Sequence, residues 1–150
     1  MMAVRLAFYY LASVLLGLSS AFAGEMVELQ IETVLATNSS QDFDNRLNDI
    51  RPQLRAFRYQ SYRLVQEERR RVGWGKQADF TLPGGRFLQV VPKHYANERI
   101  ALQVMLMEGS SPTPLMDTAL SIRNHGTLFF GGRQHQGGTL IIRIGAVAEE

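Results

Sequence analysis

The sequence predicts one antiparallel β-sandwich of about eight strands, with a single helix after the first strand. Short runs of apolar residues, several of them alternating with polar ones, are bounded by glycine, proline and asparagine. They recur at spacings of roughly 8 to 12 residues, which is typical of sandwiches and barrels. No helical pattern separates the later strands, and this argues against a parallel α/β sheet. The 150 residues are enough for one domain.

The first 23 residues have the three parts of a secretory signal peptide. Arg5 supplies a positive charge, residues 6–18 form an uncharged apolar stretch, and Ala21-Phe22-Ala23 places small residues where a signal peptidase cleaves. A single arginine favours the general secretory route over the twin-arginine route. We therefore expect cleavage after Ala23 and one mature domain over residues 24–150, in the periplasm or the medium.

An uncleaved membrane anchor is the alternative for this segment. Residues 6–24 carry no charge and approach the roughly 20 residues that span a bilayer. Serine and glycine dilute the hydrophobicity of the run, and the Ala-x-Ala pattern favours cleavage. No later apolar run is long enough to span, so we expect no transmembrane segment in the mature chain.

The first strand and the helix follow one another directly. Residues 27–35 alternate apolar and polar side chains with the period of two of a half-buried strand. Asp42 or Asp44 is then a suitable N-cap for a short helix, in which Pro52 is expected to introduce a kink or a break. The apolar residues of this helix recur at spacings of three and four, which places them on one face: Leu47, Ile50, Leu54 and Phe57.

From residue 59 onward the chain consists of short runs separated by turn residues. Gly73-Trp74-Gly75 and Pro83-Gly84-Gly85 are predicted turns, residues 95–98 are predicted to join a hairpin, and the glycine-rich residues 131–138 are predicted to form a hairpin loop. The predicted strands cover residues 61–72, 77–82, 87–91, 99–107, 115–122, 127–130 and 139–147.

The composition excludes several kinds of chemistry. The chain has no cysteine, so it has no disulfides, thiolate metal ligands or cysteine nucleophile. Sixteen basic against fourteen acidic residues give a formal charge of +2, too balanced to indicate nucleic-acid binding. Residues 132–139 nearly match a phosphate-binding loop, but Gly138 occupies the lysine position and a strand follows instead of a helix. We expect no cofactor.

The histidines do not form a recognisable catalytic or metal-binding set. His94, His125 and His135 lack the short spacings of metal ligands, and no G-x-S-x-G nucleophile motif occurs. A hydrolase would need Asp79 close to His94, or Asp117 close to His125. The sequence therefore gives no catalytic residue and predicts no metal site.

Loop aromatics and arginines are the candidate binding residues. Trp74 lies between two glycines, and it either contacts a ligand or folds back over the core as a lid. Tyr95 and Arg133 fall in other predicted loops, and with Trp74 they are candidates for binding a glycan or a peptide. The charged run Glu67-Glu68-Arg69-Arg70-Arg71 is predicted to be a solvated strand end, with docking to an acidic surface as the alternative.

The second face of two predicted strands is unusually apolar. Met105 and Met107 lie on the face opposite Leu106, and Ile141 lies opposite its neighbours in the last strand. A solvated outer face would carry more charge. Either the early helix covers this face, or Met105, Met107 and Ile141 belong to an interface with another subunit.

Three landmarks carry a resemblance to other proteins. They are Tyr62-Arg63-Leu64, Pro83-Gly84-Gly85, and the glycine pairs Gly131-Gly132 and Gly137-Gly138 before the last strand. With the signal peptide and the early helix, they resemble a group of small exported bacterial proteins of unknown function, over about residues 26–147. The resemblance implies a shared fold and a location in the bacterial envelope, and it transfers no catalytic residue.

Together these observations favour a non-enzymatic exported module for interaction or assembly, with an envelope protein as its partner. The first alternative is a β-sandwich that binds a glycan or a peptide. The second is an extracytoplasmic hydrolase.

Overall fold

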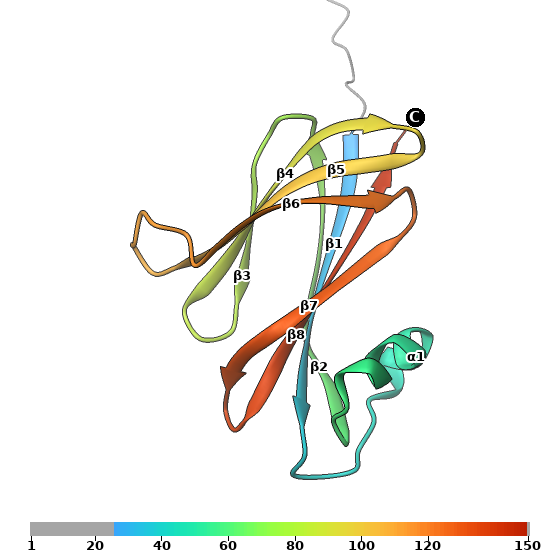
Figure 1. The fold of residues 1–150 in the computed structure, drawn as a ribbon, viewed down its shortest axis with the longest axis vertical. Coiled ribbons are helices and arrows are strands. Elements are labelled where there is room, and N and C mark those ends of the chain that lie inside the picture. The colour runs from blue at the N-terminus through green and yellow to red at the C-terminus, as the bar shows by residue number, and fades with distance from the viewer. Residues whose placement is uncertain (1–25, 150) are drawn as a thin grey trace, which may run out of the picture.

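Eight strands form two four-stranded antiparallel sheets in the computed structural model, which describes residues 26–149 apart from the side chains at positions 132 and 133 (Figure 1). The first sheet has the order β2-β1-β8-β7 and the second the order β3-β4-β5-β6. The strands are β1 (Met26–Thr37), β2 (Ser61–Gly73), β3 (Ala78–Leu82), β4 (Arg86–Ala96), β5 (Arg99–Glu108), β6 (Met116–Arg123), β7 (Thr127–His135) and β8 (Gly138–Ala148). This architecture confirms the predicted mainly-β sandwich.

The two sheets enclose one apolar core, because alternate side chains of each strand point inward. Leu29 of β1, Phe80 of β3 and Leu88 of β4 are fully buried there, as are Val104 of β5 and Ile144 of β8. This alternation is the pattern that predicted the strands.

A helical segment follows β1 and lies beside the end of the first sheet that extends beyond the second sheet (Figure 1). It consists of a 3-10 helix (η1, Asn45–Ile50), a short α-helix (α1, Arg51–Leu54) and a second 3-10 helix (η2, Arg55–Phe57). Pro52 lies in the first turn of α1, where its missing N–H has no helical partner to lose. The predicted break at Pro52 is therefore confirmed, and the single predicted helix is three short pieces.

The helical segment covers the outer face of the first sheet. Leu47, Ile50 and Leu54 are buried in one cluster with residues that point outward from the sheet, among them Val34 of β1 and Ile141 of β8. Both faces of β1 are therefore covered at this end, and every residue from Ile31 to Ala36 is buried.

Two connections differ from the sequence prediction. The β4–β5 turn is formed by Asn97 and Glu98 alone, with φ of +54° and +60°, so Tyr95 and Ala96 belong to β4. The predicted glycine loop over residues 131–138 is mostly strand, because β7 and β8 continue to a two-residue turn at Gln136 and Gly137. Positive φ at both turn residues matches the right-handed twist of the strands.

The predicted signal peptide, residues 1–23, lies outside the described residues. Within residues 26–149, no helix has the length and apolar character needed to cross a bilayer.

Candidate functional site

A cavity of about 360 Å³ opens where one end of the second sheet meets the β7–β8 hairpin. Figure 1 shows the β3–β4 hairpin, the β5–β6 connection and the β7–β8 hairpin ending on the same side of the molecule. We call this hollow the sheet-end cavity. Its lining consists of Leu82, Pro83, Arg86, Leu106, Leu115, Met116, Phe130, Gly131, Leu140 and Ile142.

Two glycines allow close approaches of the chain, Gly131 in the lining of the sheet-end cavity and Gly84 in the neighbouring hairpin. Gly84, with φ of +87°, lies at the tip of the β3–β4 hairpin, and a Cβ there would sit 3.4 Å from Nδ1 of His135. The tip of one hairpin thus meets the end of the other. At Gly131 the register of β7 against β8 shifts, and a Cβ would lie 3.2 Å from the carbonyl oxygen of Leu140. A larger residue at position 131 would therefore need this wall to shift.

Arg86 is the one charged residue in the lining of the sheet-end cavity. It belongs to the inward-facing row of β4 that continues with Leu88 and Val90, at the end where the sheets part. Its Nε is buried and has no hydrogen-bond partner among the described residues. The carboxylate of Glu108 is 3.7 Å from Nε, which is an ion pair but too long for a hydrogen bond. The cavity is therefore an apolar hollow with one under-satisfied cation in its wall.

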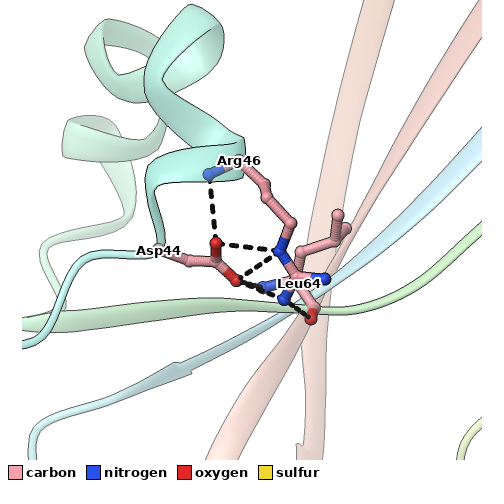
Figure 2. A network of polar contacts seen from close by, with 3 residues as sticks. All are labelled: Asp44, Arg46 and Leu64. Atoms are coloured by element: carbon pink, nitrogen blue, oxygen red, sulfur yellow. Dashed lines mark hydrogen bonds and ion pairs between the residues drawn. The ribbon is translucent and has the colours of Figure 1, made fainter.

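A second depression, of about 490 Å³, lies where the chain leaves β1 and enters η1. Its central feature is the carboxylate of Asp44, which caps η1 and joins it to β2 (Figure 2). One oxygen accepts from the backbone N–H of Arg46 at 3.0 Å, and the other accepts from the backbone N–H of Leu64 at 3.1 Å. The Arg46 guanidinium contacts both oxygens and also donates to the carbonyl oxygen of Leu64 at 3.0 Å.

These contacts give Asp44 a structural task. The hydrogen bonds from the Arg46 side chain, followed by those from the two backbone N–H groups, hold the pKa of Asp44 far below its ordinary value of 3.8. A carboxylate that is always ionised and already accepts several hydrogen bonds is a poor proton acceptor. We conclude that the network anchors the helical segment to β2, and that its N-cap is Asp44 of the two predicted candidates.

Asp44→Asn is expected to lower the melting temperature by roughly 5 °C at neutral pH, because it removes the charge from this network. Since the folded-state pKa is lowered, the stability from this carboxylate is present above about pH 4 and is lost as the pH falls toward the folded-state value. The difference in melting temperature between wild type and variant should therefore shrink between about pH 5 and pH 2. A constant difference would contradict the assignment. Asp42→Asn, two residues away and exposed, is the matched control.

The three predicted binding residues do not come together. Tyr95 lies near the end of β4 and its hydroxyl contacts Asn124, while Arg133 lies on β7 near the opposite end of the molecule, beside the hairpin that meets Gly84. The backbone position of Arg133 is therefore separated from that of Tyr95 by most of the length of the strands. Trp74 packs against the core between the sheets with its indole Nε1 buried.

The three predicted interface residues belong to two different sheets. Ile141 is fully buried beneath the helical segment, so it is not available to another subunit, which corrects that part of the prediction. Met105 and Met107 lie on the outer face of the second sheet, where Met107 pairs with Phe87. Met107 is buried and Met105 is half-buried by neighbours within that face. The covering helix explains the apolar second face of β8 but not that of β5.

The aspartate–histidine pairs that a hydrolase would need are far apart. Asp79 is paired with Gln89 of β4, and His94 lies about five residues further along that strand, a separation of roughly 15 Å. Asp117 lies near the start of β6, and His125 lies in the turn after its far end, a separation of about 20 Å. Within residues 26–149, no three histidine or carboxylate side chains are grouped so as to hold a metal ion.

Two residues that distinguish the sheet-end cavity, Arg86 and Leu115, are not among the predicted site residues. A signal for Arg86 was present, since a charge begins an inward-facing row of apolar residues directly after the Pro83-Gly84-Gly85 turn. Leu115 is 40% exposed, and only the assembled fold places it beside the other hairpins. Comparison of the chain with protein-family models, with curated proteins and with solved structures found no match.

Proposed function

We propose that the chain is an exported, non-enzymatic binding module of the bacterial envelope, and that the sheet-end cavity receives an apolar group of its partner. The observation that carries the proposal is the composition of the lining, which is apolar except for Arg86. An apolar hollow with a few polar groups is the usual form of a binding site.

The chemistry of the lining supports binding over catalysis. None of the ten lining residues is a serine, histidine, aspartate, glutamate or lysine, so the cavity holds neither a nucleophile nor an acid–base pair. Burial of apolar surface is the interaction that such a lining can offer. Export is supported by the pattern of residues 1–23 and by the resemblance to exported bacterial proteins.

Leu115 gives the proposal a direct test. It is 40% exposed at the cavity, while Val65 and Tyr95 are apolar or aromatic residues with exposures of 37% and 39% elsewhere on the surface. A photo-reactive amino acid would replace the residue at position 65, 95 or 115 in three separate variants of the tagged protein in its native cells. We expect position 115 to give a reproducible adduct with an identified envelope component.

Equal labelling at positions 65, 95 and 115, or labelling only at 65 and 95, would contradict the use of the cavity. Mass spectrometry of the same material would report the N-terminus. A chain beginning at Gly24 is expected, and an intact N-terminus would contradict cleavage.

A further inference from the structure

We infer that the sheet-end cavity binds a single-chain carboxylate amphiphile of the fatty-acid type, with its carboxylate on the Arg86 guanidinium and its chain against the apolar lining. This inference rests on the proposed function of the same cavity and names the class of ligand. It follows from the distribution of polar groups, the charge and the size of the cavity.

The polar groups of the lining select a ligand with one polar end. Arg86 has the one side chain in the lining with a hydrogen-bonding group, and the side chains of the other residues are apolar or, at Gly131, absent. A bound peptide would bring an N–H and a carbonyl group with each residue, and burying these without partners is unfavourable. A hydrocarbon chain has no such groups, so the lining favours an acyl chain over a peptide.

The charges in the wall select a single negative charge. The Arg86 side chain is 22% exposed although its Nε is buried, so a carboxylate in the cavity would accept hydrogen bonds from the terminal guanidinium nitrogens. Glu108 stands 3.7 Å away and its side chain is 52% exposed, so water can solvate it when a ligand takes its place. Once Glu108 is displaced, Arg86 offers a single positive charge, so a carboxylate is balanced whereas a doubly charged phosphate would leave one negative charge unbalanced in the cavity.

The size of the cavity limits the length of the chain. Its volume of about 360 Å³ lies at the small end of the roughly 300–1,000 Å³ range of small-molecule sites. Leu115, exposed beside the cavity, provides apolar surface onto which a longer chain can extend. A chain of medium length is therefore the expected occupant, with its far end partly outside the lining.

The test measures binding of saturated fatty acids below their micellar concentrations to protein purified after expression of the full 150-residue sequence. From octanoate to dodecanoate, the dissociation constant should fall by roughly fourfold per methylene until the cavity is filled. Methyl dodecanoate is the matched probe without a charge, and it should bind about tenfold more weakly than dodecanoate or worse.

Variants assign the carboxylate to its partner. Arg86→Gln should weaken the binding of dodecanoate about tenfold or more and leave the affinity for methyl dodecanoate unchanged. Arg123 is an exposed arginine on β6, and Arg123→Gln should change neither affinity. Leu115→Glu adds a negative charge at an exposed cavity residue and should also weaken the binding of dodecanoate. Val65→Glu is its matched control and should leave this binding unchanged. Because position 115 is exposed, this variant keeps the test decisive if Arg86→Gln fails to fold.

Several results would overturn the inference. They are equal affinities for the acid and its ester, tighter binding of dodecyl phosphate than of dodecanoate, and tighter binding of a short apolar peptide with a free carboxylate. Absence of dodecanoate binding would also overturn it. If dodecanoate failed to bind but cross-linking at position 115 succeeded, the ligand class would be wrong and the cavity would remain the binding site. If both experiments failed, the cavity would be rejected as a binding site.

Discussion

Leu54→Ala is expected to lower the free energy of unfolding by about 2–5 kcal/mol, which is a large part of the stability of a domain of this size. Leu54 is fully buried on α1, in the cluster that joins the helical segment to the outer face of the first sheet. The substitution leaves a cavity between the helical segment and the sheet, and the surrounding side chains can fill it only in part. Urea unfolding monitored by circular dichroism gives the difference.

Gln53→Ala is the matched control for this substitution. Gln53 is exposed on the same short helix, and its replacement should change the free energy of unfolding by no more than about 0.5 kcal/mol. Equal stability of the Leu54→Ala protein and wild type would show that the helical segment is not packed on the sheet. That result would leave Ile141 accessible and would restore it as an interface candidate.

Glu32→Ala is expected to lower the free energy of unfolding by about 3 kcal/mol, because it leaves the charge of Arg143 buried without its partner. The two side chains are 9% and 15% exposed, and Nη1 of Arg143 donates to Oε2 of Glu32 at 2.9 Å. The remaining carboxylate, on Asp49, is 3.6 Å away on an exposed side chain and can replace Glu32 only weakly. The free energy of unfolding would again be measured in urea.

The double substitution Glu32→Leu with Arg143→Met removes both charges together. Its free energy of unfolding is expected to be higher than that of wild type, or lower by no more than about 1 kcal/mol. The exposed pair Glu67–Arg69, at 3.5 Å, is the matched control, and Glu67→Ala should cost less than about 1 kcal/mol. If the free energy of unfolding of the double variant fell by the sum of the decreases in the two single variants, the two side chains would not be energetically coupled.

The alternation of side chains predicts most of the strands, but it does not predict where β4 and β7 end. The sequence predicts a turn over residues 95–98, whereas the observed turn consists of Asn97 and Glu98, both with positive φ. Glycine is the usual residue where φ is positive, so a turn without glycine is not marked in the sequence and its two residues are not located. In β7 the opposite occurred, because Gly131 and Gly132 continue a strand with a register shift instead of starting a loop.

The sheet-end cavity was not predictable from local pattern, because its walls come from three hairpins or connections that are far apart in sequence. Leu82, Leu106 and Leu140 each appeared as ordinary strand residues. Only the strand order of the two sheets brings them to one end of the sandwich. By contrast, the cap at Asp44 was among the predicted candidates, since capping depends on residues close in sequence.

The open edge of β2 bears on how the chain avoids aggregation. β2 has 13 residues and forms one edge of the first sheet, where unpaired backbone groups could recruit a strand from another molecule. Residues 42–44 shield its first part, because Asp44 donates its backbone N–H to the Tyr62 carbonyl oxygen and the Asp42 carbonyl oxygen accepts from the Tyr62 N–H.

The remainder of this edge carries the run from Glu67 to Arg71. Arg70 lies over the ring of Phe80 and pairs with Glu68 on the same face of β2, while Glu67 and Arg69 form an ion pair on the opposite face, so both faces of the strand carry charge. A second chain that paired here would have to desolvate these charges, which opposes growth of the sheet. The charged run therefore lies along the open edge of β2, where it opposes edge-to-edge pairing between folded molecules.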